Sequence, residues 1–274
     1  MKRMLGRSHL SPVAGRDSHP IGDNMTEQIK NNAAESSLRS KRILVLGGSS
    51  GIGLAVAQQA AAQGAQLVVA SSNPDRVQEA VQTVGEATEG RIVDLFNENS
   101  IRDFFAELGD FDHLVFTAGD TLQLGEIAAT NLDQARRAFE LRYWAALAAV
   151  KYGSPHIRRG GSIVLTTGVA GQRPHRGWAL GASVTSAVEG LTRALAVELA
   201  PLRVNAVSPG VVRTNLWKNM TEQERDAMYQ NVGKNLLVGR VGEVEDIAHA
   251  YLYLMQESYS TGQVIVVDGG ATLV

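Results

Sequence analysis

The stretch VLGGSSGIG at residues 45–53 constrains the fold of this chain more than any other. The apolar residues 43–46 predict a short buried strand before it, and helix-forming residues follow it until Gly64 stops the helix. Glycine permits a tight turn and lets the backbone approach a phosphate, while the helix that begins there directs free N–H groups at an anion. A plain turn is the alternative interpretation. Because the strand and the helix supply the context that a dinucleotide site requires, we expect a phosphate cradle.

Bulk composition excludes several classes of function. The formal net charge of the 274 residues is −2, so no strong field predicts a nucleic acid or a membrane surface as partner. The chain has no cysteine, which excludes disulfides, thiol catalysis and cysteine-ligated zinc and suits a reducing compartment. We predict no metal site. No apolar run in the sequence approaches the roughly 18 residues of a membrane span. We therefore expect a cytoplasmic protein whose partner is a small-molecule substrate.

Residues 1–40 differ in character from the rest of the chain. They contain scattered Ser, Pro, Gly, Asn and basic residues without sustained periodicity, and they lack the apolar stretch of a signal peptide. Such a composition cannot bury enough apolar surface to form a core, so we expect a disordered N-terminal extension. Met25 is an alternative start of the protein.

From Lys41 onward, strand and helix patterns alternate. After the first strand, apolar runs predict further strands at residues 66–70, 91–94, 113–116, 162–166, 203–207 and 263–267. Between them we expect helices that begin at Pro74 and Val244 or span residues 98–108, 131–152 and 182–200. Strands that are apolar throughout and alternate with helices indicate a parallel sheet covered on both faces. The prediction is a single Rossmann-like, doubly wound α/β domain with about seven strands over residues 41–274.

Two segments depart from this alternation. Residues 211–241 leave the end of the sixth strand and are mostly polar and helix-forming, so they are a candidate substrate lid; an ordinary surface excursion is the alternative. The helix at residues 131–152 carries more apolar side chains than one sheet face needs. A subunit interface explains that excess, and simple core packing is the alternative.

Several motifs in order carry a family resemblance. They are GGSSGIG at residues 47–53, Asp94 in IVDLFNENSI, TAG at residues 117–119, RVNAVSPGVVRT at 203–214, GRVGEVEDIA from Gly239 and TGQVIVVDGG from Thr261. From Lys41 to the C-terminus the chain resembles the short-chain dehydrogenase/reductase family, although Leu46 replaces a threonine of the glycine motif and TAG lacks the family's asparagines. The resemblance implies a nicotinamide dinucleotide cofactor, oxidoreductase activity and a homotetramer or homodimer.

The resemblance also implies which residues bind the cofactor. They come from the glycine turn, the ends of the second and third strands, the TAG segment and the PG segment: Gly47, Ser49, Ser50, Gly51, Ile52, Gly53, Ser71, Ser72, Asp94, Leu95, Ala118, Gly119, Pro209, Gly210, Val212 and Thr214.

The catalytic positions of the family are occupied differently in this chain. The family uses a serine, a tyrosine, a lysine four residues after the tyrosine, and an asparagine on the long helix. The alignment places the serine at Gly168, the tyrosine at Gly181, the lysine at Thr185 and the asparagine at Arg142. General acid–base catalysis contributes about 100- to 10,000-fold and needs a titratable group, which glycine does not provide. The resemblance therefore implies an atypical member.

Three residues are candidate replacements. His175 lies in the loop GVAGQRPHRGWALG, and only its unperturbed pKa lies near neutrality, so it is the candidate acid/base; a solvated loop histidine is the alternative. Thr167 could donate to a carbonyl, or could only cap or pack. Arg142 could point into the pocket, because a charge on an apolar helix needs a partner or water. Arg173 and Arg176 are candidate ligands of a substrate anion.

The end of the second strand indicates the cofactor. An acidic residue there favours NAD and an arginine favours NADP. Ser71 and Ser72 occupy those positions, no carboxylate repels a 2′-phosphate, and Arg76 is near, so we favour NADP(H) over NAD(H). Three functions remain open: an oxidoreductase with a non-standard proton donor acting on a carbonyl or alcohol, a non-catalytic dinucleotide-binding sensor or partner protein, and a non-redox reaction such as cyclisation or elimination.

Overall fold

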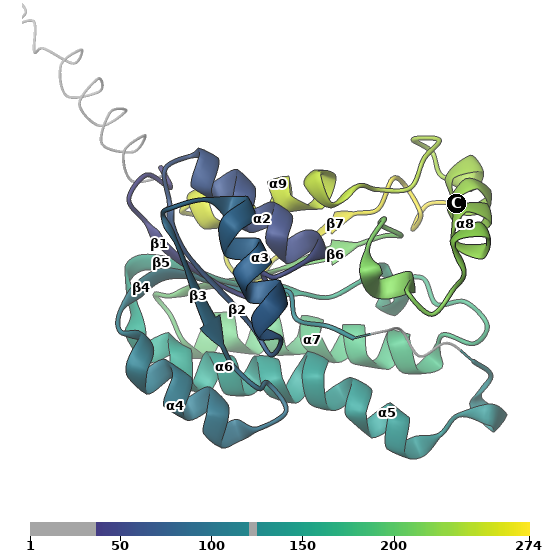
Figure 1. The fold of residues 1–274 in the computed structure, drawn as a ribbon. Helices are drawn as coiled ribbons and strands as arrows, with labels where there is room; N and C mark the ends of the chain where they lie inside the picture. The colour runs from purple at the N-terminus through teal and green to yellow at the C-terminus, as the bar shows by residue number, and fades with distance from the viewer. Residues whose placement is uncertain (1–36, 121–124) are drawn as a thin grey trace, which may run out of the picture. The chain divides into compact units, whose positions relative to one another are not determined.

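The computed structural model describes residues 37–120 and 125–274, and these form a seven-stranded parallel sheet with helices on both faces (Figure 1). The strand order is β3-β2-β1-β4-β5-β6-β7. The bounds are β1 Arg42–Leu46, β2 Gln66–Ser71, β3 Thr88–Ile92, β4 Phe111–Phe116, β5 Ile157–Thr166, β6 Arg203–Pro209 and β7 Val264–Val267. The predicted fold class is confirmed. Residues 1–36 of the predicted N-terminal extension lie outside the described residues. Leu38, which the prediction also assigned to this extension, is buried in the core.

The strand order reverses direction between β1 and β4. From β1 the chain moves outward to β2 and β3, and then returns to β4 on the other side of β1 before moving outward to β7. Val45 pairs with Val69 on one side and with Val115 on the other. In an open α/β sheet such a reversal leaves a crevice beyond the carboxyl ends of the strands, and ligands bind there.

Helices cover the two faces of the sheet unequally. One face carries α2 Gly51–Ala62, α3 Pro74–Val84 and α9 Val244–Gln256, and the other carries α4 Glu98–Leu108, α5 Leu132–Phe139, α6 Ala145–Gly153 and α7 Ala179–Glu198 (Figure 1). Each face has its own apolar core, because the strand side chains alternate between them. The remaining long helix, α8 Glu222–Asn235, lies in the segment that follows β6. Among the described residues, no helix has the length and apolarity to cross a bilayer.

The bounds of most predicted elements differ by a few residues from those in the structure, and two differences have a structural cause. The third strand was predicted at residues 91–94, but β3 spans Thr88–Ile92. This is an edge strand, where a polar sequence suffices: Glu89 forms ion pairs with Arg42 at 2.9 Å and with Arg91 at 2.6 Å. The predicted helix at residues 131–152 is present as continuous helical backbone, in which a π-turn at Glu140–Trp144 joins α5 to α6.

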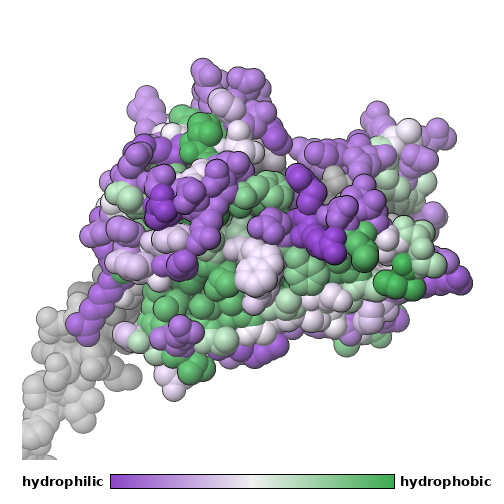
Figure 2. Space-filling model, turned by 90° about the horizontal axis from the view of Figure 1, so that it is seen from below, coloured by the Kyte–Doolittle hydropathy of each residue, from purple (hydrophilic) through white to green (hydrophobic). Residues whose placement is uncertain are grey.

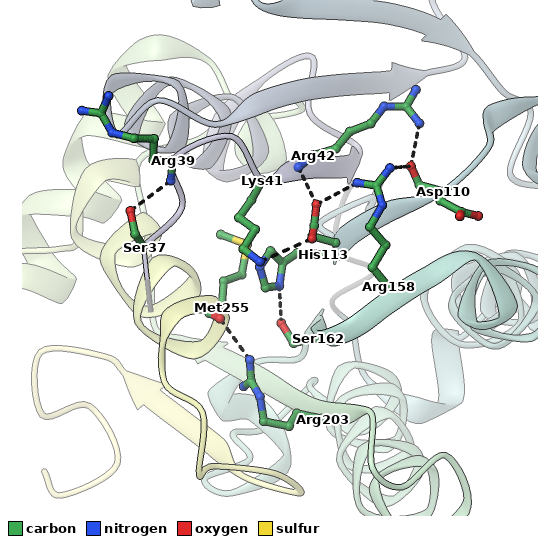
Figure 3. A network of polar contacts seen from close by, with 11 residues as sticks. Ser37, Arg39, Lys41, Arg42, Asp110, His113, Arg158, Ser162, Arg203 and Met255 are labelled. Atoms are coloured by element: carbon green, nitrogen blue, oxygen red, sulfur yellow. Dashed lines mark hydrogen bonds and ion pairs between the residues drawn. The ribbon is translucent and has the colours of Figure 1, made fainter. Parts of the chain in front are cut away.

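A polar network closes the amino edge of the sheet (Figure 3). Asp112 accepts hydrogen bonds from the Arg42 amide at 2.8 Å and from the Arg158 guanidinium at 3.1 Å. Nδ1 of the buried His113 lies 2.9 Å from the Ser162 hydroxyl. Because burial disfavours the charged imidazolium, the pKa of His113 falls to about 3. These contacts connect β1, β4 and β5 at the amino edge of the sheet, the edge opposite the carboxyl ends of the strands.

Candidate functional site

A cavity with a volume of about 420 Å³ lies at the carboxyl edge of the sheet. The ends of β2, β5 and β6 contribute to its wall, and so do the segments that follow β1, β3, β4 and β6 and the starts of α2 and α7. It therefore occupies the crevice that the strand order leaves open.

The glycine turn forms the part of this cavity that suits a phosphate. Gly47 has a φ of +85°, and a Cβ there would lie 2.5 Å from the Ala118 nitrogen. A Cβ on Gly53 would lie 2.4 Å from the Gly47 carbonyl oxygen. Ser50 precedes α2 without capping it through its side chain, so the first N–H groups of the helix keep their donors available for an anion. These residues fit a dinucleotide pyrophosphate.

Every residue that the sequence predicts to bind the cofactor lines this cavity, from Gly47 in the glycine turn to Thr214 after β6. Ser71, Ser72 and Arg76 lie together at the end of β2 and the start of α3. Asp94 lies after β3, where its carboxylate accepts a hydrogen bond from the Phe96 amide at 3.0 Å. The structure thus brings residues from five distant segments to one surface.

The positions aligned with the family's serine, tyrosine and lysine also meet in this cavity. A Cβ on Gly181 would have only the Ala170 Cβ within 4 Å, at 3.9 Å, so space lies open beside it. The Thr185 hydroxyl donates within its own helix to the carbonyl of Gly181 at 2.9 Å or Ala182 at 3.1 Å. Thr167 donates its hydroxyl proton to the Thr185 carbonyl at 2.9 Å. Neither hydroxyl proton is free for a ligand in this arrangement.

Arg142 lies on the π-turn and reaches the cavity wall. Its guanidinium packs over Gly119, where an added Cβ would lie 3.1 Å from Nη1, and it donates to the carbonyl oxygen of Asp120. Its Nε lies 3.7 Å from the Asp120 carboxylate. Burial lowers the pKa of Arg142, and the charge of Asp120 opposes that shift. A π-turn displaces the helical register by one residue, and such turns often occur at functional sites.

The loop after β5 places its charged residues away from the cavity. His175 is exposed, with its ring edge-on to Trp178 at 4.8 Å between centroids, and it does not line the cavity. Arg173 donates to the Ala271 carbonyl at 3.2 Å, and Arg176 pairs with Glu126 at 2.6 Å. Trp178 lines the cavity, whereas Arg173, His175 and Arg176 do not.

The sequence analysis missed two charged residues of the cavity wall, Asp120 and Lys218. Lys218 belongs to the predicted lid at residues 211–241, which has a small core of its own formed by Trp217, Tyr229, Leu236 and Val241. The indole nitrogen of Trp217 donates to the Val212 carbonyl at 3.0 Å. Residues 214–218 of this segment line the cavity.

Comparison of the sequence with known families gives a consistent result. A family model described as enoyl-(acyl carrier protein) reductase matches residues 47–272. The short-chain dehydrogenase/reductase ATR9 of Stachybotrys chlorohalonatus is 38% identical over 253 residues, which cover 86% of this chain and 98% of that protein. The short-chain dehydrogenase/reductase fsr5 of Gibberella fujikuroi is 34% identical over 256 residues, which cover 87% and 97%.

Solved structures give the same result. A small-chain dehydrogenase crystallised in complex with NADPH superimposes with a TM-score of 0.74 and 38% identity, covering 86% of this chain and all of that one (100%). The MalC reductase/Diels-Alderase of Malbranchea aurantiaca superimposes with a TM-score of 0.81 and 32% identity, covering 88% and 100%.

Proposed function

Because the chain belongs to the short-chain dehydrogenase/reductase family, we propose that it is an atypical NADP(H)-dependent reductase of a small carbonyl compound. The observation that carries this proposal is the cavity itself, which is lined by the dinucleotide cradle, by the half-buried Arg142 and by two glycines at family catalytic positions. In this proposal the cradle retains the family's cofactor and Arg142 takes over the polarisation of the carbonyl.

The preference for NADP(H) is supported by the end of β2. Ser71 and Ser72 offer two hydroxyls there, and Arg76, in the first turn of α3, has no carboxylate partner among the described residues. An arginine at this place accommodates a 2′-phosphate. Fluorescence titration with NADPH and NADH tests the preference, and Arg76→Gln should weaken NADPH binding about tenfold while NADH binding is unchanged. Failure of wild type to bind either dinucleotide would remove the proposal.

The proposed chemistry divides between the cofactor and the chain. When bound, the reduced dinucleotide supplies a hydride. Arg142 donates hydrogen bonds to the substrate oxygen and stabilises the negative charge that develops on it, as preorganised donors do in other sites. Proton delivery then comes from water, because the hydroxyl protons of Thr167 and Thr185 are already committed to backbone carbonyls. His175 enters this proposal only if its exposed loop moves toward the cavity.

A second candidate is cyclisation in the same cavity. The open space beside Gly181 is its structural basis, since it leaves room for a bulky substrate where the family places a tyrosine. The name of the structurally similar MalC, a reductase/Diels-Alderase, combines both kinds of reaction. Mass spectrometry separates the two, because reduction adds two hydrogen atoms and consumes NADPH, whereas cyclisation gives an isomer. A protein that binds NADPH and yields neither product is a non-catalytic sensor or partner protein.

We also propose that the protein is a homo-oligomer. Apolar side chains gather on the face that lies below in Figure 1, where α4, α5 and α6 run (Figure 2). Leu132 and Trp144 are 65% and 52% exposed. Exposed apolar surface of this kind is often buried in a self-complementary interface.

A further inference from the structure

The charges of the cavity wall do not balance. Three described cations line it, Arg76, Arg142 and Lys218, with two acids, Asp94 and Asp120. Asp120 lies against Arg142, and Asp94 accepts its hydrogen bond from the Phe96 amide. The ammonium group of Lys218 forms no hydrogen bond or ion pair with any described residue. A cation that lines a ligand cavity and has no internal partner suits an anionic group of the ligand.

The lid begins beside the glycine turn. A Cβ on Gly51 would lie 3.8 Å from the Thr214 Cβ, so Thr214 borders the start of α2. The Thr214 hydroxyl accepts the Leu216 amide at 3.3 Å and caps the short helix Asn215–Trp217, at whose end Lys218 lies. The lid lysine therefore follows within one turn of the residue that borders the phosphate cradle.

The backbone that carries Lys218 is held in place. Trp217 is buried, and its indole nitrogen donates to the Val212 carbonyl at 3.0 Å. The Lys218 amide itself donates to the Asn215 carbonyl at 3.2 Å. An ammonium group on a fixed backbone and a flexible stem is a point charge that can follow a phosphate.

We propose that Lys218 is a phosphate ligand supplied by the lid, and that it pairs with the dinucleotide pyrophosphate held at the glycine turn. The inference rests on the proposed cofactor binding and adds a residue to it. The start of α2 then binds the pyrophosphate from one side through backbone N–H groups, and Lys218 binds it from the other. Cofactor binding also stabilises the lid over the cavity, because the same contact joins them.

The test uses ADP-ribose, which contains the pyrophosphate but no nicotinamide and undergoes no reaction. Calorimetric titration of the full chain compares wild type with Lys218→Gln, Lys218→Arg and Lys234→Gln. Lys234 is the matched control, because it is an exposed lysine on α8 of the same lid and does not line the cavity. We expect Lys218→Gln to weaken ADP-ribose binding about tenfold and to reduce its salt dependence, while Lys218→Arg restores most of the affinity. Lys234→Gln should match wild type.

Two further readouts separate the outcomes. Adenosine, which has no phosphate, should bind wild type and Lys218→Gln with equal affinity. ADP-ribose should protect α8 from limited proteolysis more strongly in wild type than in Lys218→Gln. Equal ADP-ribose affinity of the two proteins overturns the proposal, and a defect confined to the KM of a substrate assigns Lys218 to the substrate instead. If wild type itself fails to bind ADP-ribose, the proposed function fails with it.

Discussion

The guanidinium of Arg142 donates to the backbone carbonyl of Asp120 and lies with its Nε 3.7 Å from the carboxylate of the same residue. This contact joins the π-turn between α5 and α6 to the segment that follows β4, and both residues line the cavity. One residue thus anchors Arg142 through a backbone hydrogen bond and an ion pair, and the other guanidinium donors remain for a ligand.

Removal of the Arg142 charge should lower turnover without affecting cofactor binding. For Arg142→Gln we expect kcat/KM for carbonyl reduction to fall about 100-fold, the usual effect of losing one preorganised donor to a developing oxyanion. Stopped-flow NADPH oxidation measures the rate, and fluorescence titration measures the NADPH affinity. Arg136→Gln is the control, because Arg136 lies on α5 and pairs with Asp133 away from the cavity. Unchanged kcat/KM in Arg142→Gln would remove Arg142 from the mechanism.

The glycine turn should not tolerate a methyl group at Gly53. A Cβ there would lie 2.4 Å from both the Gly47 carbonyl oxygen and the Thr117 hydroxyl. We expect Gly53→Ala to lower the free energy of unfolding by about 2 kcal/mol and to abolish detectable NADPH binding, because the turn must shift. Urea denaturation and fluorescence titration measure the two effects.

Gly190→Ala is the matched control for that substitution. Gly190 lies within α7, and a Cβ there meets no atom within 4 Å. This variant should gain about 0.5–1 kcal/mol from helix propensity and bind NADPH normally. A wild-type affinity in Gly53→Ala would contradict the assignment of the turn as a cradle.

Stability should depend on pH through His113. Its folded pKa is lowered to about 3 by burial, whereas the unfolded chain takes up a proton near pH 6.5. The stability linked to neutral His113 is therefore complete above about pH 6.5 and is lost as the pH falls toward 3, with a loss of about 1.4 kcal/mol by pH 5.5. Urea denaturation at pH 8 and pH 5.5 should show this loss in wild type but not in His113→Gln, which keeps a hydrogen-bonding group beside Ser162.

His249→Gln separates this effect from that of an exposed histidine on α9. It should retain the wild-type pH dependence. The same loss of stability in His113→Gln as in wild type would show that other groups cause it.

The oligomer should depend on Trp144. A glutamate there would place a charge within the proposed apolar interface, which is costly without a partner. We expect Trp144→Glu to shift the mass measured by light scattering toward the monomer. Ile92→Glu is the control, because Ile92 on the edge strand β3 has the same exposure, 52%. A monomeric wild type, or an unchanged mass in Trp144→Glu, would contradict the interface.

Local sequence was sufficient for the elements whose signals are local. The strand before Gly47, the proline that begins α3 and the helix Glu98–Leu108 were all predicted, because turn residues and apolar spacing determine them. The predicted start of the edge strand β3 lies three residues after the observed start at Thr88, because its polar side chains pair with neighbours that are remote in sequence. The π-turn between α5 and α6 has no proline or glycine to mark it.

The sequence by itself determined the sheet, the glycine turn and the set of residues that line the cradle, because backbone geometry and strand order bring those positions together whatever the loops do. Only the tertiary structure decided which charges face the cavity. The π-turn and the Asp120 carbonyl direct Arg142 toward it, and the burial of Trp217 brings Lys218 to its wall. An exposed loop leaves His175 outside. The contact of Arg142 with Asp120 and the packing of Trp217 with Tyr229 and Val241 join separate segments of the chain, and such contacts leave no periodic signal in the sequence.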